Sequence, residues 1–276
     1  MPSPALVRYE QRADAVNSLL CVGLDSQFDR LPAAFRNRAY PQAAFNEWII
    51  EQTHPFVSAY KPNMAFYEAR GEQGLAELRM TMAYLRQHHP DIFTICDAKR
   101  GDIASSNQAY AAAIFDEFGF DAVTLHPYVG RDALAPFLDR HERACIILCR
   151  TSNPGAGELQ DLRIGDRPLW QIVAEKVSRE WNAGGNCMLV VGATYPGELR
   201  AVRGLVGDMT LLIPGVGAQG GAIEAVVRAG QNGQGRGLIV NVSRGVLLAA
   251  RPGDAARAYR DEINQVRQDG PKPAQP

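Results

Sequence analysis

The sequence carries almost no net charge and has no long apolar run, and each absence excludes a class of protein. Its 29 Lys and Arg residues nearly balance 30 Asp and Glu residues, for a formal charge of −1. This balance gives no electrostatic reason to expect a nucleic-acid or membrane partner. No apolar run approaches the ~20 residues of a membrane-spanning helix, and residues 1–16 lack the apolar region of a signal peptide. We therefore expect a cytoplasmic protein.

The five cysteines form neither a disulfide framework nor a metal-binding motif. They are Cys21, Cys96, Cys145, Cys149 and Cys187, an odd number without a C-x-x-C pair. Most of them lie within apolar runs, where a thiol behaves as a small buried hydrophobic group. We expect reduced, buried cysteines and no zinc bound by them.

Eight short apolar runs alternate with helix-like segments along the chain. The runs are 19–25, 56–63, 91–99, 121–130, 144–152, 187–194, 209–217 and 237–245. Helical patterns lie between them, for example at 74–89, 105–119 and 168–185, the last of which ends in two glycines. Apolar runs that alternate with amphipathic helices are typical of a parallel sheet covered on both faces. Because ~250 residues is typical of a (β/α)8 TIM barrel, the pattern predicts that α/β fold, with an open doubly wound sheet as the alternative.

Nothing in the composition divides the chain into domains. No proline- or serine-rich linker separates two halves, and no repeat is evident beyond the architectural one. We therefore expect a single barrel domain over residues 1–270, followed by a flexible C-terminal tail at 271–276.

Polar or glycine residues follow nearly every apolar run at its C-terminal end. They are Asp25, Lys61, Asp97 with Lys99, His126, Ser152, Thr194, Gly215 with Gly217, and Arg244. The carboxyl ends of barrel strands meet at one face, and barrel enzymes build their active sites there. We expect these residues to surround one site.

The segment 97-DAKRGD-102 concentrates charge at the end of the third run, directly after its apolar part 92-IFTIC-96. Side chains alternate along a strand, so Asp97 and Lys99 are predicted to point the same way, with Lys61 beside Asp97 at the end of the neighbouring strand. Carboxylates nearby favour the charged form of a lysine, which makes Lys99 a proton donor rather than a Schiff-base nucleophile. Asp102 lies beyond the strand and could reach a neighbouring subunit. A simple ion pair at the barrel mouth is the alternative for Asp97 and Lys99.

Two loops have the composition of a phosphate site. The segment 214-PGVGAQGG-221 follows the seventh run and 243-SRG-245 follows the eighth. Barrels often bind phosphate at these positions through glycine backbone N–H groups such as those of Gly215 and Gly217. Arg244 offers a planar fork suited to phosphate oxygens, and Gln219 offers an amide donor.

The segment after the fifth run, 151–168, is predicted to be a long irregular loop. Loops of this length are often functional lids. Ser152 and Asn153 in this loop carry groups that can hydrogen-bond to the edge of a polar ring. A surface loop without ligand contact is the alternative.

Together these motifs resemble the orotidine 5′-phosphate decarboxylase family. The resemblance rests on D-x-K-x-x-D after the third run, a lysine ending the second, P-G-V-G-A-Q after the seventh and S-R-G after the eighth. It extends over about residues 19–249. The segments 97-DAKRGDI-103 and 151-TSNPG-155 are similar to those of the longer bacterial branch of that family.

The resemblance implies a homodimer that converts orotidine 5′-phosphate to uridine 5′-phosphate in de novo pyrimidine biosynthesis, without a cofactor or metal. It implies that Lys61, Asp97 and Lys99 act with Asp102 of the partner subunit, Lys99 being the proton donor. The implied substrate contacts are Asp25 and Lys61 to ribose, Ser152 to the pyrimidine, Gln219 and Arg244 to phosphate, and Ile103 and Ser106 to the partner's site. The chain has 102-DIASS-106 where the family often has D-I-G-x-T, and it lacks a tyrosine shortly after Gln219.

Three alternatives share part of this pattern. Magnesium-dependent sugar-phosphate decarboxylases and aldolases of the same barrel group resemble it, but they have an acidic metal ligand where Lys61 stands. A non-catalytic barrel that binds pyrimidine nucleotides would need the phosphate loops and not the charged set. Indole-glycerol-phosphate-type chemistry also uses the phosphate loops but leaves D-x-K-x-x-D unexplained.

Overall fold

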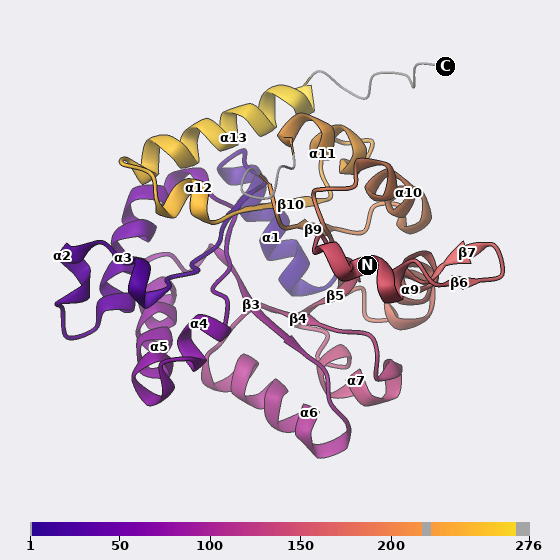
Figure 1. Cartoon of the computed structure of the whole chain (residues 1–276), viewed down its shortest axis with the longest axis horizontal. Coiled ribbons are helices and arrows are strands. Elements are labelled where there is room, and N and C mark those ends of the chain that lie inside the picture. Colours follow the sequence, from indigo (N-terminus) through magenta and orange to yellow (C-terminus); the bar gives the residue numbers. More distant parts are fainter. Residues whose placement is uncertain (1, 217–221, 269–276) are drawn as a thin grey trace.

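The computed structural model, which describes residues 2–216 and 222–268, is a closed parallel barrel surrounded by helices (Figure 1). Around the barrel the strands follow the order β1-β10-β9-β8-β5-β4-β3-β2. Their bounds are β1 (Leu20–Val22), β2 (Ala59–Tyr60), β3 (Phe93–Arg100), β4 (Ala122–Leu125), β5 (Ala144–Arg150), β8 (Cys187–Val191), β9 (Leu211–Ile213) and β10 (Leu238–Val242). The predicted (β/α)8 barrel is confirmed. Most strands are shorter than the apolar runs, because each run also includes loop residues at the barrel mouth.

Helices cover the outside of the barrel. The longer ones are α3 (Pro41–Thr53), α5 (Gly71–His88), α6 (Ala104–Ala111), α7 (Gly130–Leu138), α9 (Leu169–Lys176), α10 (Pro196–Val206), α11 (Ile223–Gly230) and α13 (Pro252–Gln268). The short ones are α2 (Ala33–Arg36), α4 (Ala65–Glu68), α8 (Gly157–Gln160) and α12 (Arg244–Leu247).

Two helices change from α-helical to π-helical geometry before they end. Helix α6 continues as a π-helix over Ala112–Glu117, and α9 does so over Val177–Trp181. The prediction that the helix at 168–185 runs to its glycines was therefore wrong at the C-terminal end. Asn182 follows the helix instead, and its Oδ1 accepts a hydrogen bond from the backbone N–H of Cys187 at 2.9 Å. This bond holds the turn that leads the chain into β8.

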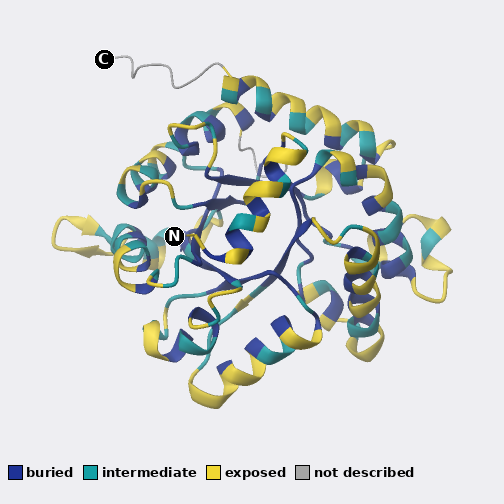
Figure 2. Ribbon diagram, turned by 180° about the vertical axis from the view of Figure 1, so that it is seen from behind, coloured by how far each residue is buried: buried dark blue, intermediate teal, exposed yellow. Residues whose placement is uncertain are grey.

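Helix α1 (Pro4–Ala15) covers the N-terminal ends of the strands, as the view from behind shows (Figure 2). Ser3 caps it by accepting a hydrogen bond from the backbone N–H of Leu6 at 3.3 Å. The Tyr9 hydroxyl donates to the carbonyl of Leu238 at 2.5 Å, and Arg12 Nε donates to the carbonyl of Val57 at 3.2 Å. With this end covered, the C-terminal ends of the strands are the open face of the barrel.

All five cysteines are buried free thiols, as the sequence predicts. Burial raises the pKa of Cys21 to about 12, so this thiol is protonated at neutral pH. In the described ranges no helix is both long and apolar enough to cross a membrane. The predicted tail at 271–276, together with Gly217 and Gln219, lies outside the described residues.

The segment 151–168 is more regular than predicted. It contains a 3-10 turn at Pro154–Ala156, helix α8, and a hairpin of β6 (Arg163–Ile164) and β7 (Arg167–Pro168). Gly165 in the hairpin turn has a φ of 62°, a conformation that glycine adopts without strain. The buried Arg150 side chain fixes the start of the segment through Glu198 at 2.5 Å and Asp161 at 3.3 Å.

Candidate active site

A cavity of about 260 Å³ opens at the C-terminal ends of β1, β2, β3, β9 and β10. Its polar lining includes Asp25, Lys61, Asp97, Asn241, Ser243 and Arg244, with the backbone of Gly215 at its edge. Five residues of this lining were predicted from the sequence and come from segments far apart in the chain: Asp25, Lys61, Asp97, Gly215 and Arg244. Closure of the barrel is what brings them around one space.

Asp97 is the centre of a hydrogen-bonded network at the floor of this cavity. Its Oδ2 accepts from Lys61 Nζ at 2.7 Å, and its Oδ1 accepts from Lys99 Nζ at 2.6 Å. Thr124 Oγ1 donates to the same Oδ1 at 3.0 Å. Asp97 and Lys61 are only 9% and 3% exposed, so the carboxylate and one of its two lysines are almost completely removed from water.

Mutual attraction keeps this buried pair ionised. Burial by itself pushes the pKa of Asp97 upward, but the ammonium groups of Lys61 and Lys99 hold it well below its usual range. Burial likewise opposes the charge on Lys61, yet Asp97 and Asp25 raise its pKa above that of a free lysine. A carboxylate flanked by a buried cation is therefore present across the physiological pH range.

Lys99 reaches Asp97 from an unusual backbone conformation. Its φ is 47°, in the left-handed region, and the pairing of β3 with β4 shifts register between Cys96 and Arg100. The alternation of a regular strand, from which the shared direction was predicted, does not hold here. The Lys99 backbone N–H instead donates to Thr124 Oγ1 at 2.9 Å. The half-exposed Lys99 side chain contacts Asp97 from this bulge, but Lys99 is not among the residues that line the cavity. Such strain is typical of functional positions.

Thr124 is a residue that the sequence analysis missed. It lies on β4, is 1% exposed, and connects the Lys99 backbone to the Asp97 carboxylate. A threonine within an otherwise apolar buried strand was the available signal, because a buried hydroxyl requires a partner.

Comparison with known proteins identifies the family of this chain. The model of the orotidine 5′-phosphate decarboxylase / HUMPS family matches residues 18–259. The orotidine 5′-phosphate decarboxylase of Cellvibrio japonicus is 48% identical over 254 residues, which cover 91% of this chain and 92% of that protein. The enzyme of that name from Herpetosiphon aurantiacus is also 48% identical and covers 92% of each chain. The chain belongs to this family.

A solved structure of the family agrees in fold. The structure of Leishmania donovani OMP decarboxylase superposes with a TM-score of 0.87 at 40% identity, covering 96% of this chain and 99% of that one. The recognition made from the strand-end motifs is confirmed at the level of the family.

In this member of the family, Asp25 faces the cavity with unused hydrogen-bonding capacity. Its Oδ1 is buried and has no hydrogen-bond partner among residues 2–216 and 222–268. A buried carboxylate oxygen without a partner is costly. A hydroxyl group in the cavity would satisfy it.

The structure does not bring Asp102, Ile103 and Ser106 into the cavity of their own chain. Asp102 Oδ1 accepts from the backbone N–H of Ile103 at 2.7 Å, and Asn107 fixes the loop by donating to the Asp102 carbonyl at 2.6 Å. Ile103 is 65% exposed, a high value for a large aliphatic side chain. Segment 102–106 therefore faces outward.

His126 supports this outward segment rather than lining the cavity. Its Nε2 lies 2.9 Å from the carbonyl oxygen of Gly101. A Cβ atom at Gly101 would meet the His126 ring at 2.5 Å, so a glycine is required at this contact.

The remaining predicted residues are placed as follows. Gly215 has a φ of 96°, which favours glycine, and it lines the cavity together with Arg244. Ser152 lies against Gly192, which directly follows β8, and it is not part of the cavity lining. Thr194 Oγ1 is buried without a hydrogen-bond partner in the part of the chain that the structure describes.

Proposed function

We propose that this chain catalyses the cofactor-independent decarboxylation of orotidine 5′-phosphate to uridine 5′-phosphate, a step of de novo pyrimidine biosynthesis. Family membership and two relatives of that name at 48% identity support the reaction. The observation that carries the proposal is the buried Asp97 held between Lys61 and Lys99 at the cavity floor. Such a set supplies fixed charges and a proton donor.

The proposed orientation follows the charges around the cavity. The phosphate lies toward Arg244 and Gly215, and the ribose hydroxyls lie toward Asp25 and Lys61. Gln219, which the family resemblance also assigns to the phosphate, lies outside the described residues. Loss of carbon dioxide leaves an electron pair on the ring carbon, and Lys99 Nζ donates a proton to that carbon. The neutral lysine then regains its proton from water.

One lysine does not account for the whole rate enhancement. A unit charge about 4 Å from the developing carbanion contributes ~4 kcal/mol at an effective dielectric constant of 20, whereas enzymes lower barriers by ~8–23 kcal/mol. We propose that binding of the phosphate and ribose supplies much of the remainder by positioning the ring against Lys99. Asp97 keeps Lys99 charged and oriented.

We further propose that the active unit is a homodimer with shared sites. Within one subunit Lys99 pairs with Asp97, while Asp102 and the exposed Ile103 face outward. An outward carboxylate next to an exposed aliphatic side chain suits insertion into a neighbouring site. Asp102 of the partner subunit would then supply a second negative charge near Lys99.

Thr124 gives a test of how the network is positioned. Thr124→Val keeps the side-chain shape but removes the bonds to Asp97 and to the Lys99 backbone. A hydrogen bond to a charged group contributes ~1.5–3 kcal/mol, so we expect kcat to fall roughly tenfold or more. Thr124→Ser retains the hydroxyl and is expected to keep most of the activity. Equal kcat in wild type and Thr124→Val, measured under saturating substrate, would contradict this role.

The nearest competing function is a magnesium-dependent reaction of a sugar phosphate. Lys61 speaks against it, because a buried ammonium group paired with Asp97 occupies the position where a cation would need an acidic ligand. The second competing function, binding of a pyrimidine nucleotide without catalysis, gives no reason for two lysines around a buried carboxylate.

One assay separates the three functions. Purified protein is incubated with orotidine 5′-phosphate and excess chelator, and the ultraviolet change on loss of the carboxylate is followed. We expect rapid conversion to uridine 5′-phosphate. Binding without conversion would favour the nucleotide-binding function. Neither binding nor conversion would favour sugar phosphates, to be assayed with magnesium restored.

A further inference from the structure

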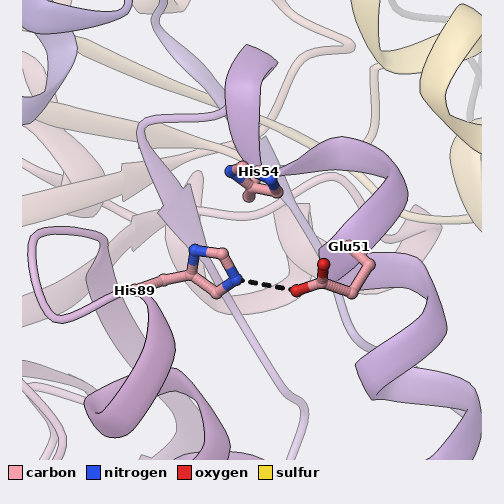
Figure 3. Close-up of side chains that lie close together, drawn as sticks. All are labelled: Glu51, His54 and His89. Atoms are coloured by element: carbon pink, nitrogen blue, oxygen red, sulfur yellow. Dashed lines mark hydrogen bonds and ion pairs between the residues drawn. The ribbon is translucent and has the colours of Figure 1, made fainter.

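A second cluster of polar side chains lies at the opposite end of the barrel from the cavity. It consists of Glu51, His54 and His89 (Figure 3), whose potential ligand atoms all lie within 4.8 Å of one another. Glu51 is near the end of α3, His54 begins the 3-10 turn His54–Phe56, and His89 directly follows α5. These segments lead into the N-terminal ends of β2 and β3.

Local helical geometry brings the three side chains together. Glu51 and His54 are three residues apart on a continuous helical path, so they share a face. His89 ends α5, its backbone N–H donating to the Leu85 carbonyl at 2.8 Å, and Pro90 prevents the helix from continuing. Helices α3 and α5 lie side by side on the barrel surface (Figure 1), which places His89 opposite Glu51.

The side chains around the cluster orient it. His89 Nε2 lies 2.9 Å from Glu51 Oε1, and the Tyr84 hydroxyl donates to the same oxygen at 2.7 Å. The rings of His54 and His89 stack with their centroids 4.4 Å apart. In metal sites, hydrogen bonds from neighbouring groups hold the metal-binding side chains in the orientation that they need.

We propose that Glu51, His54 and His89 form a binding site for a divalent transition-metal ion, with Zn²⁺ as the best match. Two imidazoles and one carboxylate are a known three-residue zinc ligand set, with water as the fourth ligand. Magnesium and calcium prefer oxygen ligands and do not suit two imidazoles. Zinc ligands at ~2.0–2.2 Å from the ion are roughly 3.3–3.6 Å apart in a tetrahedron. The potential ligand atoms of this cluster, all within 4.8 Å of one another, are already close to that spacing.

The charges around the cluster are compatible with a cation. A positive group adjoins the cluster, because Arg12 Nη2 donates to the His54 carbonyl at 2.5 Å. Its charge is matched by an ion pair with Asp91 at 2.5 Å. Because Arg12 and Asp91 neutralise each other, the Glu51 carboxylate gives this region a negative charge.

A bound ion would join the end of α3, the turn at His54 and the C-terminal end of α5. Because a ligand that binds only the folded state stabilises it by mass action, zinc is expected to raise the melting temperature. The cavity is at the other end of the barrel, so this inference does not depend on the proposed decarboxylase function.

The test uses the full chain without a polyhistidine tag. ZnCl₂ alone is titrated in competition with a chromogenic chelator, and we expect one equivalent to bind. His54→Ala and His89→Ala are each expected to weaken binding at least tenfold. Tyr84→Phe, which leaves the ligands but removes the bond to Glu51, is expected to weaken it roughly 10–100-fold.

His141→Ala is the matched control. His141 is exposed and outside the cluster, so its loss is expected to leave zinc affinity unchanged. The Co²⁺ complex of the wild type is expected to lack thiolate charge-transfer absorption, because the cysteines are buried. Circular dichroism of each variant confirms that it is folded.

Three results would overturn the inference. They are the absence of stoichiometric zinc binding, undiminished binding in both folded histidine variants, and an equal loss of affinity in His141→Ala. The last would mean that zinc binds surface histidines in general.

Discussion

Lys99→Ala will lower kcat by roughly 1000-fold or more, while affinity for uridine 5′-phosphate is partly retained. The ~4 kcal/mol that a protonated lysine contributes at about 4 Å corresponds to nearly three powers of ten in rate. The variant also lacks the group that supplies the proton. The Lys61–Asp97 ion pair remains, so the cavity keeps its buried charge pair and its phosphate-facing residues.

The measurement is kcat at saturating orotidine 5′-phosphate together with calorimetric titration of the product. Lys176→Ala is a matched control, because Lys176 pairs with Glu180 on the surface and its side chain is 51% exposed. The control is expected to behave as wild type. A Lys99→Ala rate close to that of wild type would remove Lys99 from the role of proton donor.

Mixing the inactive variants Lys99→Ala and Asp102→Ala will restore about a quarter of the wild-type rate if subunits exchange freely in a two-fold dimer. Half of the dimers are then hybrids. In each hybrid one site combines a native Lys99 with the native Asp102 of the partner subunit, and the other site lacks both. Recovered activity would therefore mean that one active site contains residues of both subunits.

A second mixture supplies the control. Lys99 and Asp97 contact each other within one subunit at 2.6 Å, so a hybrid of Lys99→Ala with Asp97→Ala has no intact site and is expected to stay inactive. Native mass spectrometry verifies that exchange has occurred. Failure of the first mixture to recover activity despite exchange would show that Asp102 does not act across the interface.

The barrel was predictable from the sequence because burial leaves a local pattern. Strands that are covered on both faces have continuous apolar runs in their sequence. Seven of the eight runs contain a whole barrel strand, and the third contains all of β3 except Arg100. The polar residues at the ends of those runs identified the open face of the barrel, and the short motifs that they form identified the family. The functional roles of Lys61, Asp97, Lys99 and Asp102 stay predictions until the variants above are measured.

Contacts between distant segments were not predictable in the same way. Thr124 holds both Asp97 and the Lys99 backbone, but a single threonine in an apolar run does not reveal its partners. The left-handed conformation of Lys99 is likewise a result of the register shift between β3 and β4. A sequence pattern with a period of two cannot encode such a shift.

The sequence by itself determined the fold class, the face that carries the site and the family, because these depend on local periodicity and on short motifs. Only the tertiary structure decided how the charges pair and that Glu51 meets His89, 38 residues further along the chain. The physical reason is that barrel closure and helix packing fix the distances between elements that are far apart in the sequence. No local pattern of polar and apolar residues specifies those distances.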